Sequence, residues 1–505
     1  MTDLNAQNPL ELEVKNFGPI AEAKIDLRPF TVFVGPSNTG KSYLAILIYA
    51  LHRFFGDRLS GNAPDDYRHH TPHYNIFWDN RDCQLSAETR NKIVEWAEQT
   101  FVEKKEPSNK ESIPIPEPIA GLVRSAYRRF DKYGFKLGDE IRRCFGINQT
   151  KALIRNGNTR NAQVIFRRSV SEDSKPFVYG LTIDAQKSVL ETTIPEQTPM
   201  RLKSPVDNLS FQDLCRMSID LKGNEPVFTS RLATAAMTHV FGPFYLPMFY
   251  LPADRTGIMH AHMALTSALI RSAPMAGLRQ TPPTPMLSGV LADFIEQLIP
   301  LGGPLHETSQ SHLGDQIEKC VLRGIVNVKT SETGSPRFTY RQQGWKTDLP
   351  LMNASSMVSE LAPVVLYLRH VVQPDNVLII EEPESHLHPA MQVEFTRQLA
   401  ALVRAGVRVL ITTHSEWVLE ELANIVRLSG LSKAERKGIE GGDVALRPEE
   451  VGAWLFQPKN RPKGSVVKEI PLDDNSGLFP SGFDEVAVAL HNNWAEISSR
   501  GGASG

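Results

Sequence analysis

Eight consecutive residues near the N-terminus have the types and spacing that bind a polyphosphate. Residues 35–42 form a complete G-x-x-x-x-G-K-[ST] pattern between an apolar run and a helical pattern. Glycines let the backbone wrap around phosphates, and the N–H groups at a helix start attract anions. Lys41 would reach the β- and γ-phosphates of a nucleotide and Ser42 would ligate Mg²⁺, whereas the alternative is a glycine-rich turn with a solvated lysine. The predicted nucleotide-contacting residues are Gly35, Pro36, Ser37, Asn38, Thr39, Gly40, Lys41 and Ser42.

Two adjacent acids follow a second apolar run, much later in the chain. Residues 377–380 predict a buried strand, and Glu381 and Glu382 come directly after it. One carboxylate can hold Mg²⁺ and the other can polarise an attacking water, but these residues alone do not assign the two roles. A solvated acidic loop is the alternative, and the phosphate loop upstream favours the catalytic interpretation.

A histidine follows a third apolar run. His414 comes after Val409-Leu410-Ile411-Thr412-Thr413, one predicted helix further along the chain than the acids. A histidine there can contact a γ-phosphate and hold the carboxylate that activates water. An ordinary loop or core histidine is the alternative. The position at a strand end in the same predicted sheet favours the functional interpretation.

These side chains need a sheet whose strands end at one edge. Apolar runs alternate with helical patterns, which predicts an α/β fold with a mixed, mostly parallel sheet. Strands are predicted at residues 11–17, 24–27, 30–34, 377–380 and 407–411, with short strands across 164–194, a hairpin at 325–341, and helices at 291–299, 364–372 and 391–403.

Composition excludes several classes of protein. The chain has 505 residues and a net charge of −2, so no global cationic field indicates a nucleic-acid-binding protein. The four cysteines are far apart and form no C-x-x-C pair, which fits a reduced, cytoplasmic compartment. The N-terminus lacks an apolar signal core, and the apolar run at residues 44–51 is too short to span a bilayer. A membrane protein and a secreted protein are therefore both disfavoured.

One internal stretch is strongly basic. Residues 124–168 contain twelve Lys and Arg against three acids, a local net charge of +9. Aromatic residues lie among them and could stack on bases, or they could be the core side of a helix. The stretch therefore predicts binding to DNA or RNA, a solvated face, or a docking surface for an acidic partner. The aromatic residues are Tyr127, Phe130, Tyr133 and Phe135.

Together these motifs resemble the ATP-binding-cassette (ABC) ATPase head of the structural-maintenance-of-chromosomes (SMC) and overcoming-lysogenization-defect (OLD) type. The E-E-P-E-x-x-L-H-P string is typical of the OLD-like branch, which is found in many prokaryotic, anti-phage defence ATPases. The resemblance covers residues 11–50 and about 350–420 well, and the rest loosely. It is carried by V-K-N-F-G-P-I at residues 14–20, the phosphate loop, Ser355-Ser356, E-E-P-E-S-H-L-H-P at 381–389 and T-T-H-S at 412–415.

The resemblance implies roles for single residues. Glu381 stands at the Mg²⁺ position, Glu382 at the catalytic glutamate and His414 at the switch histidine. Ser355 stands in the signature segment and would touch the γ-phosphate bound to the other subunit of a dimer, although a simple helix cap is the alternative. The family usually has glycine where Met357 stands, and a side chain there can crowd that nucleotide.

Three further positions are less specific. Phe17 could pack on adenine or in the core. The segment at residues 250–255 (Y-L-P-A-D-R) resembles a family strand end that replaces the Mg²⁺-contacting glutamine of other cassettes, and Asp254 or Arg255 could serve there. His386 and His388 are expected at a dimer interface rather than on a metal, because no cysteine or third ligand with zinc spacing is near.

The implied activity is ATP hydrolysis with Mg²⁺ in a homodimer, or a higher homo-oligomer, joined through the ATPase heads. ATP state would gate a separately encoded effector, such as a nuclease or toxin, in anti-phage defence. An ATPase of DNA repair or recombination acting through residues 124–168, and a scaffold that barely hydrolyses ATP, are the alternatives. No intrinsic nuclease is expected, since residues 430–505 show no convincing set of acids on strand ends.

The predicted organisation has five segments. They are the first half of the ATPase core (residues 1–60), a mixed α+β insert (61–245), a return to the core with a helical and hairpin sub-domain (246–350), the second half of the core (351–430) and a small C-terminal extension (431–505).

Overall fold

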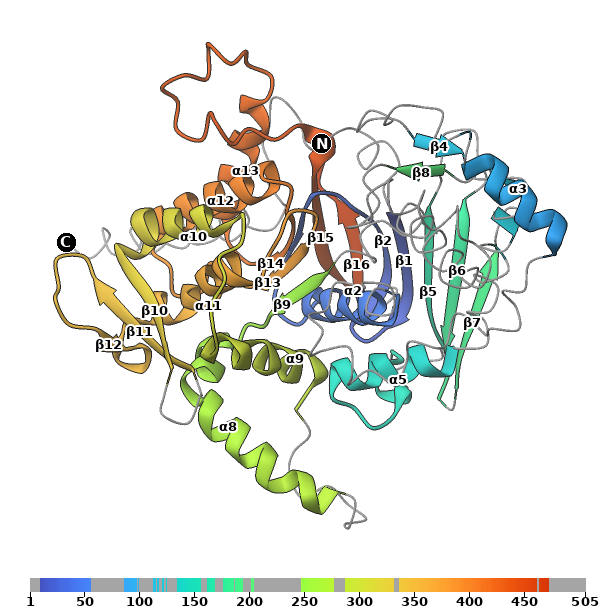
Figure 1. The fold of residues 1–505 in the computed structure, drawn as a ribbon, viewed down its shortest axis with the longest axis horizontal. Helices are drawn as coiled ribbons and strands as arrows, with labels where there is room; N and C mark the ends of the chain where they lie inside the picture. The colour runs from blue at the N-terminus through green and yellow to red at the C-terminus, as the bar shows by residue number, and fades with distance from the viewer. Residues whose placement is uncertain are drawn as a thin grey trace, which may run out of the picture. The chain divides into compact units, whose positions relative to one another are not determined.

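The structure is a computed structural model that divides into two compact units. Unit 1 comprises Met1–Leu27, Tyr43–Met248 and Leu287–Val290, and unit 2 comprises Arg28–Ser42, Phe249–Met286 and Leu291–Gly505 (Figure 1). The structure describes residues 10–55, 86–97, 99, 112–114, 116–117, 120–121, 124, 134–155, 161–168, 176–185, 187–193, 201–203, 247–276, 287–330, 336–460 and 463–471. The five-segment division stays a prediction, and residues 56–85 and 472–505 lie outside the described ranges.

Unit 1 contains an antiparallel sheet in the order β7-β6-β5-β1-β2. Val14 of β1 lies between Ala23 of β2 and Val164 of β5, and all three side chains are buried. The elements of this unit are β1 (Leu10–Phe17), β2 (Ile20–Leu27), α2 (Lys41–Phe55), α3 (Ala87–Ala97), β4 (Ser112–Pro114), α5 (Gly134–Phe145), η4 (Thr150–Leu153), β5 (Ala162–Arg168), β6 (Phe177–Ile183), β7 (Ser188–Thr193) and β8 (Arg201–Lys203). The described residues between 61 and 245 contain both helices and strands.

Helix α5 packs on β7 through glycines. A Cβ atom on Gly134 would lie 2.5 Å from the Leu190 backbone nitrogen, so the close approach requires glycine at that position. Leu137, Ile141 and Cys144 form the buried face of the helix.

Unit 2 contains the strands that matter for the candidate site. Its sheet has the order β16-β15-β3-β14-β13-β9, in which β15, β3, β14 and β13 run parallel and β16 is antiparallel to β15. Strands β3, β13 and β14 are buried along their whole length, as their continuous apolar runs predicted. The strands are β3 (Phe30–Val34), β9 (Met248–Leu251), β13 (Val377–Glu381), β14 (Arg408–Thr413), β15 (Val451–Asn460) and β16 (Lys463–Glu469).

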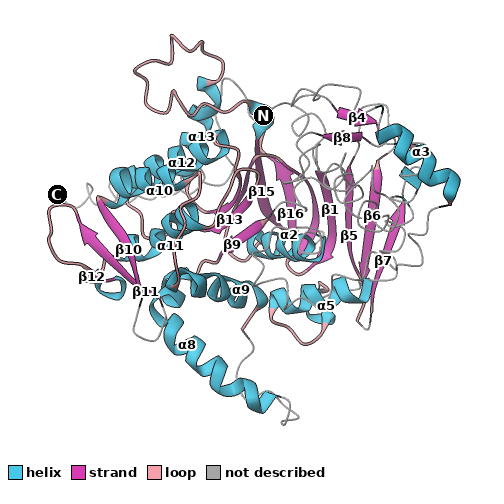
Figure 2. Ribbon diagram, in the orientation of Figure 1, coloured by secondary structure: helices cyan, strands magenta, loops and turns pink. Residues whose placement is uncertain are grey.

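Helices alternate with the parallel strands (Figure 2). Helix α12 packs on both β14 and α13. A separate antiparallel sheet, β10-β11-β12, belongs to the predicted helical and hairpin region. These elements are α8 (Arg255–Ala276), α9 (Gly289–Leu298), η6 (Ile299–Gly302), α10 (Ser311–Ile317), η7 (Glu318–Leu322), β10 (Gly324–Thr330), β11 (Pro336–Gln342), β12 (Leu349–Pro350), η8 (Leu351–Asn353), α11 (Ser356–His370), α12 (Pro389–Arg404), α13 (Glu416–Leu428) and η9 (Pro448–Glu450).

The predicted α/β class with a mixed sheet is confirmed, and the mostly parallel part is the sheet of unit 2. Helix α8 continues through Pro274 to Ala276. Among the described residues, no helix has the length and apolar character needed to cross a bilayer.

Candidate nucleotide site

Strand register brings the three motifs of unit 2 to one edge of its sheet. Val34 of β3 lies opposite Thr413 of β14, and Thr412 of β14 lies opposite Glu381 of β13. Because the strands are parallel, the chain leaves all three at their carboxyl ends, the edge where open α/β sheets bind ligands. The phosphate loop, the adjacent acids and the histidine therefore follow neighbouring strand ends.

The phosphate loop is shaped by its glycines. Gly35 has φ +141°, and a Cβ atom there would lie 2.5 Å from the carbonyl oxygen of Phe456 on β15. Only glycine therefore fits between β3 and β15 at this point. Gly40 also has a positive φ, +100°, and the Thr39 hydroxyl donates to the Pro36 carbonyl at 2.8 Å, which closes the turn. The loop is thus fixed by contacts within this chain.

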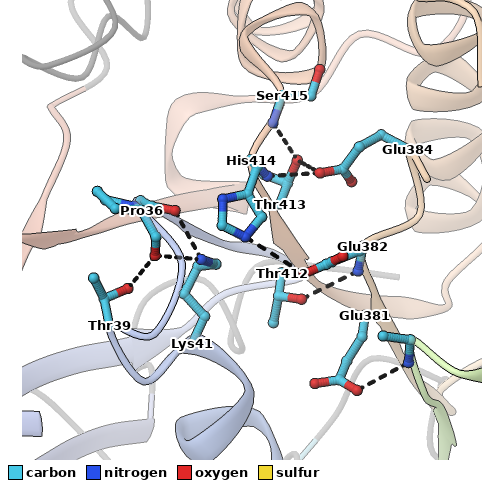
Figure 3. Close-up of polar contacts among 12 residues, drawn as sticks. Pro36, Thr39, Lys41, Glu381, Glu382, Glu384, Thr412, Thr413, His414 and Ser415 are labelled. Carbon is cyan, nitrogen blue, oxygen red and sulfur yellow. Dashed lines mark hydrogen bonds and ion pairs between the residues drawn. The ribbon is translucent and has the colours of Figure 1, made fainter. Parts of the chain in front are cut away.

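Lys41, the first residue of α2, turns back onto this loop. Its Nζ donates to the carbonyl oxygens of Gly35 at 2.8 Å and Pro36 at 2.9 Å (Figure 3). Burial lowers the pKa of Lys41 to about 8, and the charges of Glu382 and Glu384 oppose that shift. Among the described residues no carboxylate lies within ion-pair distance of this ammonium, whose side chain is 5% exposed. The site therefore contains a buried cation whose hydrogen bonds, within the described part of the chain, go to backbone carbonyls.

The two adjacent acids have different surroundings. Glu381 is buried, and one of its carboxylate oxygens, Oε2, accepts a hydrogen bond from the Ala253 N–H at 3.1 Å. The side chain of Glu382 is 40% exposed. The backbone of Glu382 has φ +43°, and its N–H donates to the Thr412 carbonyl at 2.9 Å. Because Glu382 has this left-handed conformation, the side chains of Glu381 and Glu382 leave the backbone in different directions.

His414 lies beside Glu382. Its Nε2 is 3.5 Å from Oε1 of Glu382, and Figure 3 shows the ring between this carboxylate and the phosphate loop. The interaction with His414 is the main cause that lowers the pKa of Glu382, with further lowering by Lys41 and Arg255. Glu382 is therefore ionised at neutral pH, as a group that accepts a proton from water must be.

Glu384 is a residue whose part in the site was not foreseen. Its Oε1 accepts hydrogen bonds from the Thr413 hydroxyl at 2.8 Å and from the His414 N–H at 2.7 Å. Burial raises the pKa of Glu384, and its Oε2 has no hydrogen-bond partner in the described part of the chain. Glu384 thus fixes the backbone that carries His414. The third acid of the E-E-P-E string was the available signal.

Ser355 lies at the start of α11. Its Oγ accepts a hydrogen bond from the Val358 N–H at 3.4 Å, so within one chain it acts as the helix cap that was the alternative interpretation. Ser355 is exposed and does not join the hydrogen-bond cluster of Lys41, Glu382 and His414. Met357 is partly exposed, one residue into the helix. A role towards a second subunit is compatible with this exposed cap.

Three other candidate positions have structural explanations. Phe17 of unit 1 is fully buried and packs edge-to-face on Phe145, so core packing, rather than adenine stacking, describes this ring. Arg255 is fully buried and hydrogen-bonds to carbonyl oxygens, so it does not replace a Mg²⁺-contacting glutamine, whereas Asp254 is exposed. His388 caps α12, and the described residues contain no group of three metal-ligating side chains that includes it or His386.

Four of the described cations of the basic stretch are paired with acids. Arg142 pairs with Asp139 and Arg143 with Glu140, one helical turn apart on α5. The other pairs are Arg124 with Glu117 and Arg167 with Glu13. Phe135 is 55% exposed. Other basic and aromatic residues of this stretch lie outside the described ranges, namely Arg128, Arg129, Lys132, Arg160, Tyr127, Phe130 and Tyr133.

Comparison with protein families agrees with the strand-end geometry. The family model described as AAA ATPase domain matches residues 10–186 and 287–419, which is more than half of the chain. The chain belongs to the AAA ATPase domain family. The matched residues of this ATPase include the phosphate loop, both acids and His414. No curated protein matches its sequence.

Solved structures similar to this AAA ATPase include three SMC heads, each at 10% identity and over 92% of this chain. A crystal structure of the SmcHead bound to the C-winged helix domain of ScpA has a TM-score of 0.38 over 97% of its own chain. The SMC head domain from Thermotoga maritima has 0.34 over 99%. The Smc head domain with an extended coiled coil, bound to the C-terminal domain of ScpA derived from Pyrococcus furiosus, has 0.39 over 97%.

The side chains of this AAA ATPase fit ATP with Mg²⁺. Lys41 is a buried cation held by neutral carbonyls, and a phosphate oxygen would satisfy its charge better. Ser42 is partly exposed in the first turn of α2, and the hydrogen bond from Ala253 engages only one carboxylate oxygen of Glu381. Hydroxyl and carboxylate oxygens are the ligands that Mg²⁺ prefers.

Proposed function

We propose that this chain binds and hydrolyses ATP at the strand-end site of unit 2. One observation carries the proposal. A buried Lys41 that forms no ion pair among the described residues lies near an ionised Glu382, and the carboxylate of Glu382 is 3.5 Å from His414. A buried cation whose hydrogen bonds go to neutral carbonyls is suited to a phosphate, and a nearby ionised carboxylate is suited to activating water. The alternative of a solvated acidic loop does not explain why the three groups lie together.

Each residue has one role in this proposal. Lys41 exchanges the carbonyls of Gly35 and Pro36 for the β- and γ-phosphates, and Ser42 and Glu381 are the ligands for Mg²⁺. When bound, Mg²⁺ neutralises charge that develops on the phosphates. Glu382 accepts a proton from the attacking water, and His414 orients the Glu382 carboxylate. The exposure of the Glu382 side chain leaves room for that water.

Replacing Glu382 with glutamine tests the catalytic assignment. Glu382→Gln keeps the shape of the side chain but removes its basicity, so turnover should fall at least ~100-fold, the scale of a lost general base, while ATP still binds. Phosphate release and ATP affinity would be measured separately. Glu416→Gln, an exposed acid in the first turn of α13, is the matched control and should turn over normally. Full turnover in Glu382→Gln would refute the assignment.

We further propose that two copies close around ATP, with Ser355 of each contacting the nucleotide of the other. The support is the exposed Ser355 cap, next to η8 in which Met352 is 61% exposed. The Glu382→Gln protein should then form dimers in ATP but not without it, as sedimentation would show. Wild-type turnover per chain should rise with protein concentration. Turnover independent of concentration would contradict the dimer, and no turnover at all would leave the ATP-binding scaffold as the better account.

The cellular role proposed is the gating of a separately encoded effector, a nuclease or toxin, in anti-phage defence. Its support is the resemblance of the E-E-P-E-S-H-L-H-P string to OLD-like defence ATPases, and no nuclease is proposed within this chain. Capture of proteins on Glu382→Gln in ATP, against the same protein without nucleotide, would identify the effector. Direct action on DNA is less well supported, because four described cations of the basic stretch are paired with acids.

A further inference from the structure

Arg255 links the acidic end of β13 to α11. It is the first residue of α8 and is fully buried. Its Nη1 donates to the Glu381 carbonyl at 2.6 Å, and its Nη2 donates to the Glu382 carbonyl at 3.3 Å. On the side of α11, Nε donates to the Glu360 carbonyl at 3.0 Å, and Nη2 lies 2.8 Å from the Glu360 carboxylate. One guanidinium therefore binds the carbonyls of Glu381 and Glu382 and also one turn of α11.

The partner Glu360 is equally buried. Its side chain is 2% exposed and also accepts a hydrogen bond from the Thr256 hydroxyl, and His260 contacts the neighbouring Ser359 at 3.0 Å. The first turns of α8 thus dock on one turn of α11. Burial lowers the pKa of Arg255, and the charge of Glu360 is the main opposing cause.

The burial of this pair is not explained by stability alone. Removing two charges from water is expensive, and well-packed apolar residues in place of a buried ion pair are often as stable or more stable. A fixed geometry is what apolar residues would not supply, because only a planar fork can bind several carbonyls at defined angles.

The backbone that Arg255 holds is strained. Glu382 has φ +43°, a left-handed conformation that is uncommon outside glycine and persists where neighbouring groups fix it. The Thr412 carbonyl holds the N–H of Glu382, and Arg255 holds its carbonyl. This conformation directs the carboxylate towards His414.

Helix α11 connects Glu360, the partner of Arg255, to the exposed cap residue Ser355. The Ser359 N–H donates to the Ser355 carbonyl at 3.0 Å, and Glu360 is the next residue. Arg255 therefore acts about one helical turn from Ser355.

We infer that Arg255 is a positioning residue that fixes the Glu382 backbone relative to the Ser355 cap of α11. A movement of the Glu382 backbone would then move the Arg255 guanidinium, and with it α11, the helix that would face a second subunit. This inference rests on the proposed function, because it names how that site is held and coupled.

Arg255→Lys tests the inference, because lysine keeps the charge near Glu360 but cannot bind both strand-end carbonyls. Turnover should fall at least ~10-fold, the scale seen when groups supporting a site are lost, while ATP affinity stays within about twofold. Arg369→Lys is the matched control. Arg369 is a largely buried arginine at the other end of α11, bound to Glu318 and Asp315, and should lose stability without losing turnover. Equal kcat in Arg255→Lys and wild type would overturn the inference.

A double variant separates positioning from folding. Arg255→Met with Glu360→Met removes both buried charges together, so no unpaired charge is left in the core, although the carbonyls that Arg255 bound lose their donor. The protein should therefore fold, with a lower melting temperature than the wild type, and still bind ATP. Turnover should remain at least ~10-fold low, because no group holds the Glu382 carbonyl. Wild-type turnover in this folded variant would overturn the inference. If the wild-type protein itself shows no turnover, the proposed function fails and the inference fails with it, whereas normal wild-type turnover with an unaffected Arg255→Lys refutes the inference alone.

Discussion

The strand-end site and the basic stretch both carry cations, but they satisfy those charges in different ways. At the site, Lys41 is buried, and among the described residues its ammonium donates hydrogen bonds to neutral carbonyls and forms no direct ion pair. In the basic stretch of unit 1, Arg142, Arg143 and Arg167 each pair with a carboxylate of the same chain. A buried cation with no direct ion pair can bind an anionic ligand without first breaking one, whereas each of these arginines would have to leave its carboxylate. Pairing therefore indicates function better than charge density does.

Removing Lys41 should have the largest effect. Lys41→Met should weaken ATP binding at least ~100-fold, because the cation that meets the phosphates is lost. Lys41→Met should also stabilise the nucleotide-free protein, because the cost of burying the charge is removed.

The size of this stabilisation follows from the pKa of Lys41, which folding lowers from 10.5 to about 8. A tenfold change in a protonation equilibrium corresponds to about 1.4 kcal/mol, so burial of the charge costs up to about 3 kcal/mol at pH 7. That cost is complete below pH 8 and disappears as pH rises through 10.5.

A paired arginine provides the control for Lys41→Met. Arg167→Met breaks a partly exposed pair with Glu13, so it should lower stability by about 0–1 kcal/mol and leave ATP affinity unchanged. Thermal unfolding and calorimetric titration with ATP would measure both variants. If Lys41→Met were less stable than the wild type, the unpaired cation would be a structural group.

The second effect is a pH dependence of ATP affinity. Free Lys41 loses its proton as pH rises through about 8. Bound phosphates favour the charged form and so raise the pKa, which means that binding takes up a proton at higher pH. Affinity should be constant below pH 8 and fall by up to about tenfold for each pH unit above it, measured at constant Mg²⁺. Lys41→Arg stays ionised and should give a flat profile between pH 8 and 9.5. A flat wild-type profile would contradict the assignment.

The sequence was most informative where local pattern decides structure. Residues 35–42 and the apolar runs before Glu381 and His414 were enough to predict three strand ends at one edge, because parallel strands share their direction. The roles of Arg255 and Glu360 were not predictable in the same way, since the two residues are 105 positions apart and only tertiary packing pairs them. An acid within the apolar pattern of α11 was the only hint of a buried partner.

The charge count of the basic stretch did not show this pairing, for a related reason. It considered residues 124–168 alone, whereas Glu13 and Glu117, which pair with Arg167 and Arg124, lie outside that window. A net charge summed along the sequence does not show which carboxylates the fold brings next to it. For Phe17, the core explanation required knowing that Phe145 packs on the same ring.

The smallest effect is expected where the cations are already paired. Arg142→Gln with Arg143→Gln should hardly change binding of the protein to double-stranded DNA, because Asp139 and Glu140 already neutralise both arginines. Each phosphate contact adds about 0.9 to the slope of log affinity against log salt concentration. The double variant should therefore change that slope by less than about 0.9, the value for one contact. ATP turnover should also show the same response to DNA as in the wild type.

A matched pair of lysines makes this last test discriminating. Lys151 in η4 is exposed, and so is Lys319 in unit 2, and replacing each with glutamine gives the effect of losing an ordinary surface charge. If the arginine variant changes the slope by about two contacts while these lysine variants do not, both guanidiniums leave their acids to bind phosphates. In that case DNA phosphates can displace Asp139 and Glu140 from the two arginines. Direct action on DNA then becomes the better account of unit 1.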